Sequence, residues 1–265
     1  MKHSTMALSI EELAYAMGVL GGTEVANGYL ASLLGERPQR EVEGRLLAAS
    51  HGLVARGHLE LDPVTGDKQL SVELANLVGV LLQNDYFLRC TRVAAGREEI
   101  VNFYVSGDTY VEHRLDKAVV AWVSALSGRE EIGRQAAEFF DLKPAHKFTA
   151  PASSVGAIPA LLFEKIGQSS LNANAKQIAA QLVTGDLSVD IAHAMAADLA
   201  SLTCRGSVMK ILVRDGAFIS DDAFLIFKGP QGYWILEVVS QEPSMLQVFV
   251  GTPDQFSRSI QTLIA

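Results

Sequence analysis

Ser207 and Lys210 have the S-x-x-K spacing of penicillin-interacting serine enzymes. That chemistry needs the serine at the start of a helix, so that a lysine one turn later can lower the pKa of the serine hydroxyl. The surrounding residues 208–213, VMKILV, instead resemble a strand, in which residues three apart point to opposite faces of the sheet. We therefore expect no catalytic role for this pair.

The other residues that could take part in catalysis or metal binding are scattered along the sequence. The six histidines form no H-E-x-x-H motif, and no Cys/His spacing suits zinc. The sequence also lacks G-x-S-x-G, P-loop and G-x-G-x-x-G motifs. Two cysteines, Cys90 and Cys204, are too few for a disulfide framework and are interpreted as small apolar residues at strand entries. We expect no catalytic residue, no metal site and no cofactor, and hence a protein that is not an enzyme.

Aromatic residues in two neighbouring strand-like segments, FLIF and GYWIL, are the only positive indication of a binding surface. Alternation places Tyr233 and Trp234 on opposite faces of a sheet, so that both faces are apolar. Either the sheet is covered twice, with these residues in the core, or one face is offered to a partner. The partner-binding candidates are Phe224, Phe227, Tyr233 and Trp234.

Composition narrows the class of protein. The chain has 265 residues, of which 49% are hydrophobic, and a formal net charge of −8. An acidic chain lacks the basic face with which a non-specific nucleic-acid binder displaces counterions. No uninterrupted apolar stretch reaches the length of a bilayer span, and Glu11 and Glu12 precede any apolar run near the N-terminus, so we expect neither membrane insertion nor a secretory signal. A cytoplasmic location is the default expectation.

Residues 1–62 read as three helices, near 10–20, 23–34 and 39–56, followed by a short strand at 58–62 and the turn PVTGD. This is the outline of a winged helix, which suggests a DNA-binding transcription regulator with a C-terminal sensing domain. The third helix, which would read DNA, carries Arg40, Arg45 and Arg56 but also Glu41 and Glu43. With five Lys/Arg against eight Asp/Glu in residues 1–62, the charge is unfavourable for DNA. DNA binding is therefore the alternative hypothesis.

The sequence LSVELA at Leu70 returns as LSVDIA at Leu187. Each copy begins a helix that is followed by several strand-like segments, joined at the hairpin turns SGD and GPQG. In this interpretation Asp116 caps a helix that runs through residue 126 and corresponds to the final helix at 253–264. We expect an α+β fold with two related helix–antiparallel sheet–helix halves and a helical, winged-helix-like N-terminus.

The expected segments, packed as one compact unit, are residues 1–62 (helical N-terminus), 63–142 (first half), 143–186 (helical connection) and 187–265 (second half).

Residues 51–93, HGLVARGHLELDPVTGDKQLSVELANLVGVLLQNDYFLRCTRV, resemble a stretch typical of EspG proteins, the secretion-associated chaperones of ESX (type VII) systems. That stretch is a small-residue helix, Gly-Leu-Val, a short strand, a turn, and a helix that ends before a long strand. Residues 149–166 lie where the family begins its second half, and the C-terminal hairpin and Thr-Pro-Asp helix also resemble the family. The resemblance implies a quasi-twofold fold with a sheet in each half.

The resulting hypothesis is a non-enzymatic, protein-binding chaperone or adaptor of the cytosol, acting on type VII-like secretion substrates. It would hold another protein, such as an aggregation-prone helical secreted substrate, through an apolar sheet edge or a helical groove. We expect nucleic-acid binding only under the alternative hypothesis. The sequence leaves the oligomeric state open.

Overall fold

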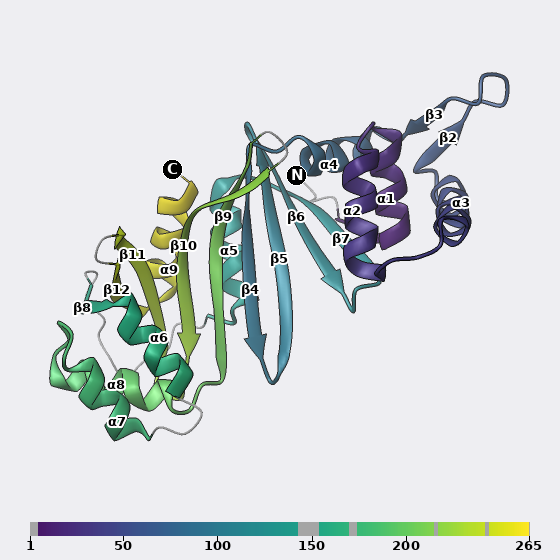
Figure 1. The fold of residues 1–265 in the computed structure, drawn as a ribbon. Helices are drawn as coiled ribbons and strands as arrows, with labels where there is room; N and C mark the ends of the chain where they lie inside the picture. The colour runs from purple at the N-terminus through teal and green to yellow at the C-terminus, as the bar shows by residue number, and fades with distance from the viewer. Residues whose placement is uncertain (1–4, 143–153, 170–173, 215–216, 242–243, 265) are drawn as a thin grey trace. The chain divides into compact units, whose positions relative to one another are not determined.

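The computed structural model describes residues 5–142, 154–169, 174–214, 217–241 and 244–264 (Figure 1). Parts of the expected helical connection, and residues 149–153 of the EspG-like stretch, lie outside the described residues. The chain divides into two compact units, the first formed by Met1–Phe87 with Val101–Arg129 and the second by Leu88–Ile100 with Glu130–Ala265. The segment boundaries expected at 62, 142 and 186 stay a prediction.

An antiparallel sheet forms one layer of the first unit. Its strands lie in the order β1-β7-β6-β5, and β5 also contributes residues to the second unit. The bounds are Thr5–Ser9 for β1, Val120–Leu126 for β7, Thr109–Asp116 for β6 and Arg97–Ser106 for β5. Side chains alternate along β1, so that Met6 and Leu8 are buried in the core while Thr5 and Ala7 are exposed.

Helices cover the buried face of that sheet (Figure 1). They are α1 (Ile10–Val19), α2 (Thr23–Leu34) and α4 (Val72–Leu82). Helix α3 (Gln39–Ala55) packs against α1, and a hairpin of β2 (Leu59–Leu61) and β3 (Lys68–Leu70) lies between α3 and α4. Helix α1 begins with a capping box, in which Ser9 and Glu12 each accept a hydrogen bond from the other's backbone N–H. Three helices followed by a two-stranded hairpin confirm the winged-helix-like outline of the N-terminus.

The second unit has a sheet that is covered on both faces. Its strands lie in the order β4-β9-β10-β11-β12-β8. Their bounds are Tyr86–Ala94 (β4), Cys204–Arg214 (β9), Ala217–Lys228 (β10), Tyr233–Gln241 (β11), Ser244–Gly251 (β12) and Gly156–Pro159 (β8). The helices of this unit are α5 (Arg129–Phe139), α6 (Ala160–Ser169), α7 (Ala175–Leu182), α8 (Val189–Leu199) and α9 (Pro253–Ile264).

The repeated hexapeptides begin equivalent helices. Ser71 caps α4 and Ser188 caps α8, each by accepting the N–H of the third helical residue at 3.4 Å. Leu70 and Leu187, just before the caps, are both buried. The strand order also repeats, as β1-β7-β6-β5-β4 in the first half of the chain and β8-β12-β11-β10-β9 in the second. The expected α+β fold with two related halves is thereby confirmed.

The helix expected from Asp116 through residue 126 is wrong, because this segment is strand β7. Lys117 and Ala118 adopt φ angles of +51° and +54°, and the Val119 N–H donates to the Asp116 carbonyl at 3.0 Å. This closes a tight turn that returns the chain antiparallel to β6. The counterpart of β7 is therefore β12, and the counterpart of the final helix α9 is α5.

Candidate functional site

An apolar groove of about 290 Å³ lies in the second unit. Strands β4, β9 and β10 contribute to it, together with α6 and the end of α8. Its lining residues are Val93, Phe163, Leu199, Leu202, Arg205, Gly206, Ser207, Leu225, Ile226 and Phe227. The volume is sufficient for one or a few large side chains but lies at the lower end of the range for small-molecule sites.

The aromatic side chains of the groove are fixed by stacking. The rings of Phe163 and Phe227 lie 6.1 Å apart with an angle of 26° between their planes. Behind Phe227, the ring of Trp234 continues the stack at 6.4 Å and 21°. Because Phe227 and Trp234 are almost fully buried, they form a rigid base, whereas Leu202 keeps 39% of its surface exposed at the mouth. A partner can therefore reach apolar surface without rearrangement of the core.

One glycine allows the strands around the groove to approach closely. A Cβ on Gly206 would lie 2.1 Å from the Thr91 carbonyl oxygen and 2.7 Å from the ring of Phe140. Beside it, Arg205 is exposed and is the one charged residue in the lining set. A ligand group with a negative charge next to its apolar part would therefore find a cation at the rim.

The structure places the four candidate partner-binding residues on both faces of the sheet. Phe227 and Trp234 lie on the groove side, in the core that α6, α7 and α8 cover. Phe224 lies on the other face, edge-to-face with Phe256 of α9 at 5.6 Å, and the Tyr233 hydroxyl donates to the Asp141 carbonyl. All four are buried, as the interpretation of a sheet covered twice requires. Their direct role in binding stays a prediction, and Phe227 alone lines the groove.

Sequence reasoning missed Phe163, Leu202 and Arg205. They come from different segments and share no spacing, so only the tertiary fold brings them together. Leu202 and Arg205 do follow the second hexapeptide helix directly, which is the one signal that could have directed attention to them.

Ser207 and Lys210 both lie on strand β9 rather than at a helix start, as expected. They occupy opposite faces of the strand because their spacing is odd. Within the described ranges, no group of three or more His, Cys, Asp or Glu side chains could hold a metal ion. Among the described residues, no helix is both long and apolar enough to cross a bilayer.

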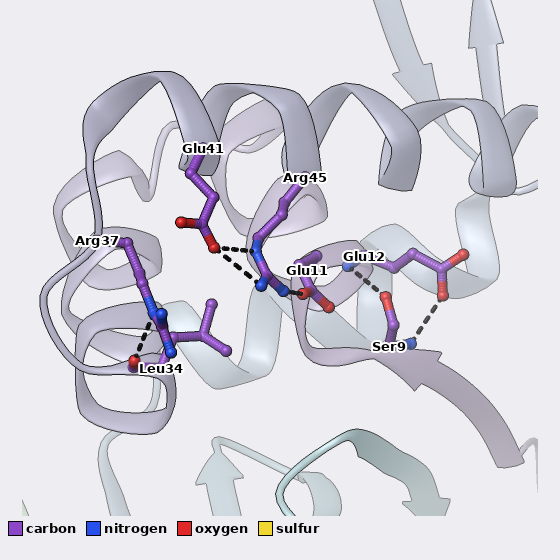
Figure 2. Close-up of polar contacts among 7 residues, drawn as sticks. All are labelled: Ser9, Glu11, Glu12, Leu34, Arg37, Glu41 and Arg45. Atoms are coloured by element: carbon purple, nitrogen blue, oxygen red, sulfur yellow. Dashed lines mark hydrogen bonds and ion pairs between the residues drawn. The ribbon is translucent and has the colours of Figure 1, made fainter.

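Two of the three arginines considered for DNA reading, Arg45 and Arg56, make contacts within the protein, and Figure 2 shows those of Arg45. Arg45 bonds to Glu11 of α1 and to Glu41 of α3, each at 3.0 Å, and these bonds raise the pKa of Arg45. Arg56 pairs with Glu12. The exposed residues of α3 include Leu47 and Val54, together with Gln39 and Arg40 at its N-terminal end. The contacts of Arg45 and Arg56 disfavour DNA recognition through these two side chains.

No protein-family model and no curated protein matches the sequence. Among solved structures, the chain is similar to EspG5, the type VII secretion system chaperone of Mycobacterium tuberculosis, in a complex with the PE25–PPE41 dimer. The match covers 98% of this chain and 96% of EspG5, with a TM-score of 0.69 and 13% sequence identity. The fold is EspG-like. The resemblance noted in residues 51–93 is confirmed at the level of the fold.

The EspG-like fold spans both units rather than one of them, since nearly the whole of each chain is matched. At 13% identity the likeness concerns the backbone and leaves the side chains of the groove as features of this protein.

Proposed function

We propose that this protein is a non-enzymatic chaperone of the cytosol that holds a secreted, helical protein of a type VII-like system until delivery. The observation that carries the proposal is the EspG-like fold over 98% of the chain, because the matched protein is a secretion chaperone in complex with a protein dimer. Fold alone does not fix function, so the proposal also rests on the groove, whose surface is suited to protein binding rather than catalysis.

In this proposal the partner inserts an apolar side chain between Phe163 and Leu202. Full burial of one large apolar side chain contributes roughly 1.5–3 kcal/mol, which is a useful anchor but not a complete interface. Arg205 would orient the partner by attracting an acidic group beside that anchor. Binding by an apolar groove needs no proton transfer or covalent step, in agreement with the absence of catalytic motifs from the sequence.

The test is affinity purification of the tagged protein from its native host after nuclease treatment, with mass spectrometry of the bound proteins. We expect one or two small helical secreted proteins at near-equal stoichiometry. Leu202→Asp places a charge at the mouth of the groove and should reduce this recovery at least tenfold.

The matched control is Leu161→Asp on α6, where the leucine is 61% exposed and does not line the groove. It should leave recovery unchanged. Equal recovery with both variants would exclude the groove as the binding site. Retention of DNA in a parallel purification without nuclease, in place of a protein partner, would favour the winged-helix hypothesis.

A further inference from the structure

Strand β1 is the edge of the first unit's sheet, and its free side can be assigned residue by residue. It pairs with β7 on one side and has no neighbour on the other in the strand order of the described residues. The Ile10 N–H donates to Val119, on the β7 side. Backbone groups alternate along a strand, so those of Thr5, Ala7 and Ser9 point away from β7. These three residues therefore form the free edge.

Two side chains from neighbouring helices close that edge. The Glu12 carboxylate accepts the Ser9 N–H at 2.8 Å through Oε2 and pairs with Arg56 through Oε1. Arg56 in turn donates from Nη1 to the Ala7 carbonyl oxygen at 2.9 Å. Gly52 provides the room, since a Cβ there would lie 2.6 Å from Glu12 Oε1. The Glu12–Arg56 pair thus occupies two of the outward backbone groups of β1.

The edge strand of the second unit is closed differently. In β8 the Ala157 carbonyl accepts the backbone N–H of Asp186 at 3.0 Å, and Pro159 has no N–H to offer. The edge of β8 is therefore closed by a main-chain hydrogen bond and by a proline, and a change of side-chain charge would not expose it. The closure of β1 instead depends on an ion pair in which the Arg56 side chain is 40% exposed and the Glu12 side chain 12% exposed.

We propose that the free edge of β1 can pair with the same edge of a second copy of this chain. The Glu12–Arg56 pair covers this edge and prevents the pairing. The free edge is self-complementary in an antiparallel pairing centred on Ala7, which places Thr5 of each copy opposite Ser9 of the other. Its residues are small and uncharged, and β1 contains no lysine or proline, the usual protection of an exposed edge. The protection comes from α1 and α3.

The test measures the molar mass of the full chain in solution by light scattering. Arg56→Ala should double the mass relative to the wild type. Arg45→Ala is the matched control, because Arg45 also joins α3 to a glutamate of α1 but does not contact β1. It should leave the mass unchanged.

A second substitution identifies the surface that pairs. Ala7→Pro removes the outward N–H of Ala7 while leaving the β7 side of the strand intact. In the Arg56→Ala background it should restore the wild-type mass. An increased mass that persists in Ala7→Pro/Arg56→Ala would overturn the proposal, as would an Arg56→Ala protein with the wild-type mass at every concentration up to its solubility limit.

Gly52→Ala serves as an independent variant that keeps both charges and displaces only the Glu12 carboxylate. It should increase the mass in the same direction as Arg56→Ala, and it carries the test if Arg56→Ala does not fold.

Discussion

The indole Nε1 of Trp234 donates a hydrogen bond of 2.8 Å to Oδ2 of Asp198, a carboxylate with no exposed surface. The other oxygen of Asp198 accepts the Gln231 N–H at 2.7 Å. One aspartate thus joins the end of helix α8 to strand β11 and to the turn between β10 and β11. Gly229 makes this approach possible, because a Cβ there would lie 2.3 Å from the Asp198 Cβ.

We expect Asp198→Ala to lower the free energy of unfolding by about 2–4 kcal/mol, because it leaves the buried indole N–H of Trp234 and the partly buried N–H of Gln231 without this acceptor. Asp198→Asn should also destabilise, since its amide can accept from one donor but must direct its NH₂ at the other. Denaturant titration in a Trp122→Phe background, where Trp234 is the remaining tryptophan, gives both the midpoint and the local environment. An Asp198→Ala midpoint equal to that of the background would contradict this role.

His113 is held neutral in the core of the first unit. Its Nε2 lies 3.5 Å from the Tyr29 hydroxyl, and within the described residues Nδ1 has no hydrogen-bond partner. Burial lowers the pKa of His113 from 6.5 to about 4. Between pH 6.5 and about pH 4, the imidazole of His113 therefore binds a proton in the unfolded chain but stays neutral in the folded chain.

The free energy of unfolding should fall as the pH drops from 6.5 toward 4, by up to about 1.4 kcal/mol per pH unit and on the order of 3 kcal/mol in total. The expected difference between wild type and His113→Gln is a shallower pH dependence for the variant over this window. Urea unfolding at a series of pH values measures it. His51→Gln, at an exposed position of α3, is the control and should retain the wild-type slope.

The turn between β6 and β7 holds two non-glycine residues in the left-handed region, which costs roughly 1–2 kcal/mol per residue. Ala118→Gly removes part of this strain and should raise the free energy of unfolding by about 0.5–1 kcal/mol. Thermal unfolding measures the change. Ala48→Gly, at an exposed position inside α3, is the opposite control and should destabilise by up to about 1 kcal/mol. Destabilisation by both variants would show that the turn is not strained.

Gly206→Ala should destabilise the protein by more than about 2 kcal/mol, because the added Cβ collides with the Thr91 carbonyl, which is main chain and cannot rotate away. The comparison is Gly44→Ala in α3, where nothing lies within 4 Å of the added carbon. That variant should gain up to about 1 kcal/mol from helix propensity. Chemical unfolding of the two variants side by side distinguishes the packing effect from the backbone effect.

Local signals in the sequence predict most of the secondary structure. The capping serines before α1, α4 and α8 and the alternation along the strands are visible without a structure. Strand β7 is missed because the turn before it has Lys117 and Ala118 at positions where a hairpin turn usually has glycine or asparagine. In addition, Asp116 is a residue type that often caps a helix. Strand β8 is missed as well, since four residues carry too little pattern and depend on β12 for their pairing.

The groove is harder to predict. Phe227 and Trp234 are conspicuous in the sequence as aromatic residues, yet they form the buried base of the site. The accessible surface comes from Phe163, Leu202 and Arg205, whose proximity depends on how α6 and α8 pack on β9 and β10. Periodicity reports which side chains are apolar, but it does not report which of them a helix leaves uncovered.

The pairing of β1 with β7 has a consequence during biosynthesis. Thr5 and Ser124 lie opposite each other across these strands but are 119 residues apart in the chain. At ordinary rates of translation, roughly 6–24 s separate the synthesis of the two strands. Throughout that interval the edge of β1 that will pair with β7 is open, whereas the residues of α1, α3 and the Glu12–Arg56 pair have all been synthesised by residue 56. The residues that close the outer edge of β1 are therefore made well before the strand that pairs with its inner edge.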